Sequence, residues 1–158
     1  MPTYQSVHKL FIAALADEAY EALTNWEIRG QWRKGMEVQW EGTSKAFIGQ
    51  SILFKIKGFP VYTFSYKITG LEPNYRVYME YTGRFLKGRC AIEIKKREKG
   101  CEVAFHWMKV EPMGVLSKIY FVSGLGFRAH ERRTKETLRM LKEYLESKAE
   151  AQPSSPLG

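Results

Sequence analysis

Hydrophobic and polar positions alternate through the middle of the chain, most clearly between Tyr62 and Tyr81. A period of two is typical of strands that bury one face, so this stretch predicts a β-hairpin. Tyrosines make up half of the predicted inner face, and a buried phenol needs a partner for its hydroxyl. The face is therefore either an ordinary core or the wall of a site. Its predicted members are Tyr62, Phe64, Tyr66, Ile68, Tyr75, Val77, Met79 and Tyr81.

The same period continues on both sides of this hairpin, interrupted by segments rich in Gly, Pro, Asn and Ser. A first strand is expected around Val7 to Ile12. No helical pattern separates the later strands from one another, so we expect an antiparallel meander. Its predicted strands are 36–41, 47–56, 61–69, 75–82, 88–97 and 101–110.

The pairing register follows from the alternation, because residues directly opposite each other in an antiparallel pair share a face. The predicted register collects the large apolar groups on one face and separates Cys90 from Cys101, so we expect no disulfide. The opposite face carries Lys67, Arg76, Glu80, Arg89, Glu93, Lys95, Arg97 and Glu102. The predicted pairs are Phe54–Phe64, Ile52–Tyr66, Tyr66–Val77, Ile68–Tyr75, Tyr62–Tyr81, Met79–Cys90, Val77–Ile92, Ile94–Val103, Ile92–Phe105 and Cys90–Trp107.

Helical spacing flanks the predicted sheet on both sides. A helix is expected from Ala16 to Asn25, followed by a short helix around Ile28 to Arg33. A long amphipathic helix is expected from Phe127 to Lys148, with a stripe at helical spacing that can cover the sheet, formed by Thr134, Leu138, Leu141 and Leu145.

The apolar segment 114–127 precedes the long helix and contains three glycines. It is either a first helical portion, bent near Gly124 and Gly126, or a mobile cover, which would serve as a gate or as an edge that touches a membrane. We predict a single domain at 1–149 and a disordered tail at 150–158.

Composition and charge narrow the classes of function. The chain has 158 residues, 44% hydrophobic and 27% charged, which fits one soluble globular domain. The N-terminus has no apolar segment typical of a signal peptide, so we expect a cytoplasmic location. The net charge of +8 can favour anionic membranes or nucleic acid. Because charges of both signs are mixed along the chain, we do not expect nucleic acid as a partner.

Residues able to bind metal or perform acid–base chemistry are sparse. His8, His106 and His130 are scattered, and no group of residues has metal-ligand spacing, so we expect no metal and no cofactor. The inner face lacks carboxylates in the predicted register, which argues against general acid–base catalysis. No catalytic residue is predicted.

Four segments share the hydrophobic pattern of a known family: FIAALADEAYEALTNWEIRGQW (11–32), FIGQSILFKIKG (47–58), YKITGLEPNYRV (66–77) and LRMLKEYLES (138–147). In combination they resemble the START-like superfamily, also called SRPBCC or the helix-grip, birch-pollen-allergen-like fold. The nearest likeness is to its polyketide cyclase/dehydrase and lipid transport branch. The resemblance implies an α+β fold, in which a curved antiparallel sheet of six or seven strands wraps around a long C-terminal helix.

The resemblance also implies a hydrophobic cavity between the sheet and that helix, because members of the family bind lipids, sterols, polyketides or quinones. It makes the tyrosine-rich face part of a binding site for an apolar small molecule, held by a carrier or sensor. The expected ligand-binding residues are Ile52, Phe54, Tyr62, Phe64, Tyr66, Tyr75, Met79, Tyr81, Cys90, Ile92, Phe105 and Trp107.

Two other functions remain open at this point. The first is a cyclase, aromatase or dehydratase, which would need an internal ionisable group with a shifted pKa. The second is a module that binds proteins or the ribosome, which would have a collapsed cavity and a functional basic outer face. A transient contact with an anionic membrane is a further expectation, and the oligomeric state is undetermined.

Overall fold

A computed structural model describes residues 4–57, 62–83 and 86–151, with the backbone alone at Tyr62 and Ala151. One antiparallel sheet of seven strands has the order β1-β7-β6-β5-β4-β3-β2, so the predicted α+β meander is confirmed. The strands are β1 (Tyr4–Ile12), β2 (Met36–Trp40), β3 (Ser51–Ile56), β4 (Tyr62–Glu72), β5 (Arg76–Gly83), β6 (Leu86–Arg97) and β7 (Gly100–Pro112).

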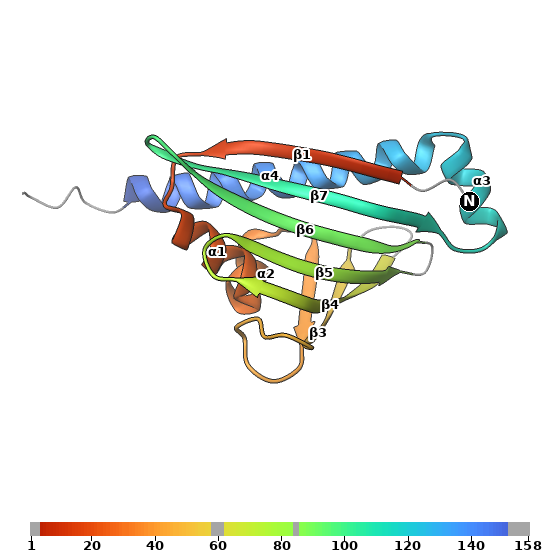
Figure 1. The fold of residues 1–158 in the computed structure, drawn as a ribbon, viewed down its shortest axis with the longest axis horizontal. Helices are drawn as coiled ribbons and strands as arrows, with labels where there is room; N and C mark the ends of the chain where they lie inside the picture. The colour runs from red at the N-terminus through yellow and green to blue at the C-terminus, as the bar shows by residue number, and fades with distance from the viewer. Residues whose placement is uncertain (1–3, 58–61, 84–85, 152–158) are drawn as a thin grey trace, which may run out of the picture.

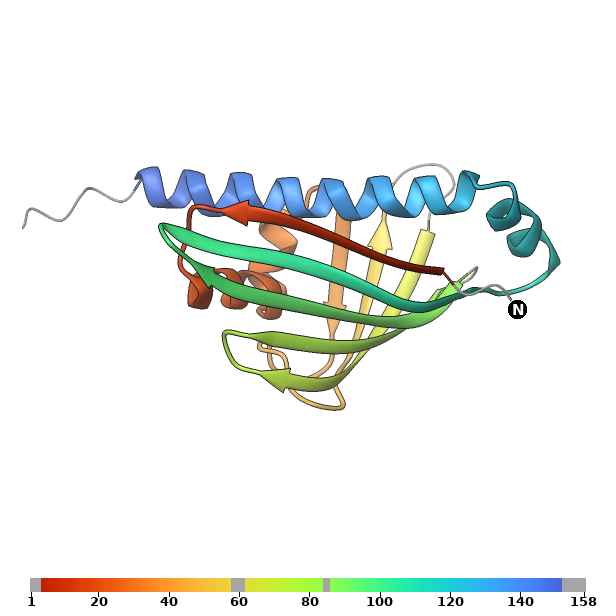
Figure 2. The ribbon, with the colours of Figure 1, turned by 45° about the horizontal axis from the view of Figure 1, so that its top comes forward.

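Four helices accompany the sheet in the described part of the chain: α1 (Ala16–Thr24), α2 (Trp26–Trp32), α3 (Val115–Val122) and α4 (Leu125–Ala151). The curved sheet and the long helix α4 form two layers, and α1 and α2 lie against the same side of the sheet (Figure 1). Figure 2 shows α4 along the open side of the curved sheet, with α3 folded back at its N-terminal end. The leucines that α4 presents to the sheet, Leu138, Leu141 and Leu145, are buried.

Three of the four predicted hairpin registers are confirmed. Phe54 lies opposite Phe64, Met79 opposite Cys90, and Ile92 opposite Phe105. Both cysteines are free and buried, as expected from their separation in this register.

The predicted register of the β4–β5 hairpin is wrong by four residues. Tyr66 lies opposite Tyr81, not Val77, and Ile68 lies opposite Met79, not Tyr75. Strand β4 extends further toward the turn than the pattern predicts, to Glu72, and a β-bulge follows Ile68.

Gly70 occupies that bulge, where a Cβ atom would lie 2.9 Å from the Tyr78 ring. Because a larger residue would clash there, the glycine permits a local irregularity that alternation alone does not reveal. Asn74 closes the turn at a positive φ of 63°, a conformation that Asn tolerates well.

The predicted strand 47–56 is too long at its start, because β3 begins only at Ser51. Gly49 has a φ of 89°, which interrupts the extended backbone before the strand. Gln50 follows it, and its buried side-chain amide donates to the carbonyls of Glu41 and Thr43. Residues 47–50 therefore form a loop organised by a buried polar side chain.

The apolar segment before the long helix forms a helix of its own, α3, and a bend joins it to α4. Gly124 stands at the bend with a φ of 84°, a left-handed conformation that favours glycine. Of the predicted tail at 150–158, Glu150 and Ala151 still belong to α4, and 152–158 lie outside the described residues.

Candidate functional site

A cavity of about 570 Å³ lies between the concave face of the sheet and α4. Small-molecule sites typically measure about 300–1,000 Å³, so this volume suits an organic ligand. Strand residues form the floor, α4 forms the roof, α2 lines one end, and α3 lines the other.

The floor is a set of aromatic rings in edge-to-face contact. The rings of Phe64 and Tyr66 have centroids 5.3 Å apart, those of Tyr66 and Tyr81 5.9 Å, and those of Tyr81 and Trp107 5.2 Å. Phe105 stacks on Trp107 at 6.5 Å. Interlocked aromatic rings give a rigid apolar surface on which a flat or chain-like molecule can pack.

The structure places most of the twelve predicted site residues in or around the cavity. Five of the twelve line the cavity: Phe64, Tyr66, Tyr81, Phe105 and Trp107. Another five are buried in the surrounding core without lining it: Ile52, Phe54, Met79, Cys90 and Ile92. The side chain of Tyr62 lies outside the described residues, and Tyr75 needs a correction.

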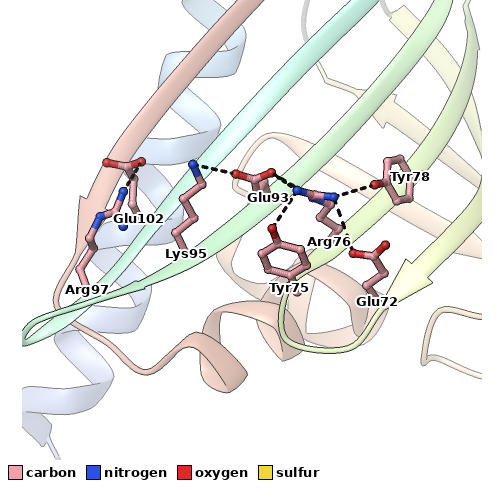
Figure 3. A network of polar contacts seen from close by, with 8 residues as sticks. All are labelled: Glu72, Tyr75, Arg76, Tyr78, Glu93, Lys95, Arg97 and Glu102. Atoms are coloured by element: carbon pink, nitrogen blue, oxygen red, sulfur yellow. Dashed lines mark hydrogen bonds and ion pairs between the residues drawn. The ribbon is translucent and has the colours of Figure 1, made fainter.

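Tyr75 does not face the cavity, so its placement on the inner face was wrong. It lies in the β4–β5 turn with 41% of its surface exposed. Its hydroxyl accepts a hydrogen bond from Arg76, whose guanidinium also lies 4.4 Å from the Tyr75 ring centroid. Figure 3 shows Tyr75 in the polar network that joins Arg76 to Glu93 on the outer face. The mistake arose because the pattern places Tyr75 at the start of a strand, whereas β5 begins only at Arg76.

Helix α2 is held rigidly at the end of the cavity. Asn25 caps its N-terminus, and the side chain of Asn25 accepts a hydrogen bond from the Ile28 backbone N–H. The indole of Trp26 donates to Gln50 at 2.7 Å, and that of Trp32 donates to the Ala22 carbonyl at 2.8 Å. The buried face of α2 is thereby fixed against both the 41–50 loop and α1.

Two arginines of this region line the cavity, and sequence reasoning did not select them. Arg29 is 4% exposed and Arg33 is 5% exposed. The Nε atom of Arg33 donates to the Thr137 hydroxyl at 2.9 Å, which links the end of α2 to α4. The three-residue spacing of Trp26, Arg29 and Trp32 is the signal that could have placed Arg29 on a buried helix face.

The part of α4 that lines the cavity carries polar groups, unlike the leucines that this helix presents to the sheet. Thr134 accepts a hydrogen bond from the Trp107 indole at 3.0 Å and donates to the His130 carbonyl at 3.1 Å. The His130 ring lies edge-on to Trp107, with centroids 4.5 Å apart. His130 belongs to the cavity lining, although no pattern in the sequence distinguishes it from the other histidines.

The imidazole of His130 has a shifted proton affinity. Burial, the positive charge of Arg133 and the proximity of His8 lower the pKa of His130 to about 4, and Glu131 opposes them. Its Nδ1 atom is inaccessible to solvent and has no hydrogen-bond partner among the described residues. The ring is therefore neutral at pH 7.

The shift predicts that stability falls in mild acid. An unfolded histidine has a pKa near 6.5, so between about pH 6.5 and pH 4 the unfolded chain binds a proton that the folded chain does not. The stabilisation present above pH 6.5 is thus lost as the pH falls toward 4, by up to about 3 kcal/mol. Urea unfolding over this range should show a steeper loss for the wild type than for His130→Gln. Parallel curves for the two proteins would contradict the assignment.

Helix α3 closes one end of the cavity with its inner face. Ser117 and Phe121 are buried, and both line the cavity. The Phe121 ring packs so closely on α4 that a Cβ atom at Gly126 would lie 2.9 Å from it. The outer face of α3 is apolar yet exposed, with Val115, Ile119 and Val122 each at 63–76% exposure.

Comparison with known proteins shows the fold but no family. No protein-family model matches the sequence, and no curated protein matches it. Solved structures do match over nearly the whole chain. A putative uncharacterized protein from Rhizobium leguminosarum has a TM-score of 0.75 at 14% identity, covering 92% of this chain and 96% of its own.

Two further solved structures also share the fold at low sequence identity. A protein from Chromobacterium violaceum has a TM-score of 0.67 at 14% identity, covering 92% of this chain and 99% of its own. The Aha1 dimer from Colwellia psychrerythraea has a TM-score of 0.65 at 19% identity, covering 90% of this chain and 96% of its own. The architecture of a seven-stranded sheet and a long C-terminal helix is compatible with the helix-grip fold. Among the described residues, no helix is long and apolar enough to cross a membrane.

Proposed function

We propose that this chain binds a hydrophobic small molecule in the cavity beneath α4 and serves as its carrier or sensor. The observation that carries the proposal is the cavity itself, about 570 Å³ in volume and floored by interlocked aromatic rings. Burying apolar ligand surface there would contribute about 25 cal/mol for each Å² removed from water.

We assign the chain to the START-like superfamily, in its polyketide cyclase/dehydrase and lipid transport branch. The order of the elements and the four resembling segments support this assignment, and the likeness to the solved structures supports it at the level of the fold. The two free, buried cysteines suit the cytoplasmic location expected from the sequence.

A neutral fluorescent probe, N-phenyl-1-naphthylamine, tests the binding proposal. The wild type should bind it with enhanced fluorescence, and Trp107→Ala should weaken binding about tenfold or more, because a large ring of the floor is lost. Trp40→Ala is the matched control, since Trp40 does not line the cavity. Circular dichroism checks that each variant is folded. No binding by the wild type, or equal binding by both variants, would refute the site.

We further propose that the outer face of α3 docks on an anionic membrane, where apolar ligands are collected or delivered. Val115, Ile119 and Val122 are exposed on this face, Lys118 belongs to the same helix, and Arg128 follows in the first turn of α4, in a chain of net charge +8. Exposed apolar groups flanked by cations are typical of interfacial helices.

Vesicle co-sedimentation tests this contact. The wild type should bind phosphatidylglycerol vesicles and bind phosphatidylcholine vesicles less. Replacing both Ile119 and Val122 by Glu should weaken binding about tenfold or more, whereas Val7→Glu, at an exposed valine of β1, should not. Equal sedimentation of all three proteins would exclude α3 as the docking face.

A cyclase- or dehydratase-type enzyme is a second candidate, which one observation favours. The imidazole of His130 lines the cavity roof in its neutral form, and a neutral imidazole can accept a proton, although a pKa of about 4 makes it a weak base at pH 7. The discriminating experiment compares the wild type with His130→Gln on any compound extracted from the protein. Conversion by the wild type alone supports the enzyme, and binding without conversion supports the carrier. An interaction module is disfavoured, because it calls for a collapsed cavity.

A further inference from the structure

The charges that line the cavity are all of one sign. Among its described lining residues are Arg29, Arg33, Lys57 and Arg133, and none is Asp or Glu. A purely apolar ligand would give these cations nothing to bind. The excess of positive charge in the lining therefore helps to define the class of ligand that the cavity accepts.

Arg29 is the most deeply buried of these cations. Its guanidinium lies over the rings of Phe54, at 4.9 Å, and Trp26, at 5.7 Å. Its Nη1 atom donates to the Leu23 carbonyl at 3.3 Å. The Nε atom is inaccessible to solvent and has no hydrogen-bond partner in the described part of the chain.

Burying a charged group without a partner costs free energy. A guanidinium cannot avoid this cost by losing its proton, because it stays charged in proteins. Stacked rings and one carbonyl leave much of its donor capacity unused. In the described residues, no carboxylate forms an ion pair with Arg29 or Arg33, although Glu136 acts on Arg33 from a greater distance. Burial and the positive charge of Arg33 both lower the pKa of Arg29. An anion in the cavity would supply the missing ion-pair partner and would offset the repulsion between the two arginines.

The cations gather toward one end of the cavity. The α4 residues that line it run from Gly126, against Phe121 of α3, to Thr137, against Arg33. At 1.5 Å per residue these eleven steps span about 16 Å. The α3 end is apolar, and the α2 end holds the buried arginines.

We infer that the ligand is an amphipathic anion, whose oxyanion head binds Arg29 and Arg33 at the α2 end while its apolar body extends over the aromatic floor toward α3. The planar fork of donors on arginine matches the oxygens of a carboxylate or a phosphate. The head would occupy a rigid site, because α2 is fixed by the bonds of Trp26 and Trp32. This inference rests on the proposed function, since it names the ligand class of the same cavity.

Displacement of N-phenyl-1-naphthylamine by dodecanoate, dodecyl phosphate and dodecanol tests the inference, at pH 8 and below the concentrations at which these compounds form micelles. The two anions should displace the probe from the wild type at concentrations about tenfold or more below that of dodecanol. Arg29→Met and Arg33→Met should each reduce this preference and keep dodecanol affinity within about twofold. Arg132→Met, which removes an exposed cation of α4 outside the cavity, should change neither.

The neutral probe separates the two ways of failing. If it binds every variant but anions and alcohol displace it equally from the wild type, the inference is wrong and the proposed function stands. An unchanged preference in both Arg29→Met and Arg33→Met would equally overturn it. If the probe does not bind the wild type, the proposed function fails and the inference falls with it. Stronger competition by the phosphate or by the carboxylate identifies the head group.

Discussion

Ala129→Phe should abolish ligand binding while leaving the protein folded. Ala129 lies on α4 and lines the cavity, so a phenyl ring there would occupy the space in which the ligand packs. Because a ligand of this kind of site buries most of its surface, we expect the affinity for the neutral probe to fall about a hundredfold or more. Fluorescence titration measures the affinity, and thermal unfolding measures the stability.

Ala149→Phe is the matched control, because Ala149 is exposed near the end of the same helix, outside the cavity. It makes the same chemical change and should leave the affinity unaltered. Full probe binding by Ala129→Phe would place the ligand elsewhere on the protein, and equal losses in both variants would indicate damage to α4 itself.

Trp26→Ala should cause the largest loss of stability, about 3–5 kcal/mol in the free energy of unfolding. The Trp26 side chain is fully buried, and its ring meets that of Phe54 edge-on at 6.2 Å. Its removal leaves a cavity and deprives Gln50 of a 2.7 Å hydrogen bond. Urea unfolding monitored by circular dichroism measures the change.

Trp40→Ala provides the comparison, because Trp40 lies half-buried on the edge strand β2. We expect less than half the loss seen for Trp26→Ala. Similar losses would mean that the 41–50 loop and α2 do not depend on the Trp26–Gln50 contact. The site would then lack the rigid support described here.

The sheet could be predicted from the sequence because alternation determines which residues share a face. The shift in the β4–β5 hairpin is an even number of residues, so Tyr66 and Tyr81 kept their predicted face despite the wrong partners. Tyr75 did not, because the turn begins just before it and removes it from the strand. The bulge at Gly70 depends on packing against Tyr78, which no local pattern displays.

The aromatic floor of the site could be predicted from the sequence, whereas its buried arginines could not. The aromatic floor lies on strands, where a period of two separates inside from outside. The burial of Arg29 and Arg33 depends instead on how the short helix α2 docks against the 41–50 loop and α4. A charged residue on a two-turn helix is ordinarily exposed, so the residue type alone predicts exposure where the structure shows burial.

His130 shows the same limit on the long helix. The stripe that includes Thr134, Leu138 and Leu141 was evident from helical spacing, and His130 lies four residues before Thr134. Its role depends on contact with Trp107, a residue of β7 that is distant in the sequence. Such a contact between elements is visible only in the folded chain.

The most direct test is mass spectrometry of what the protein carries. The protein would be purified from its native host under non-denaturing conditions, extracted with organic solvent, and compared with an extract of Ala129→Phe prepared in parallel. We expect one hydrophobic compound in near-stoichiometric amount from the wild type and its absence from the variant. The same compounds at the same trace levels in both extracts would contradict a ligand held in the cavity.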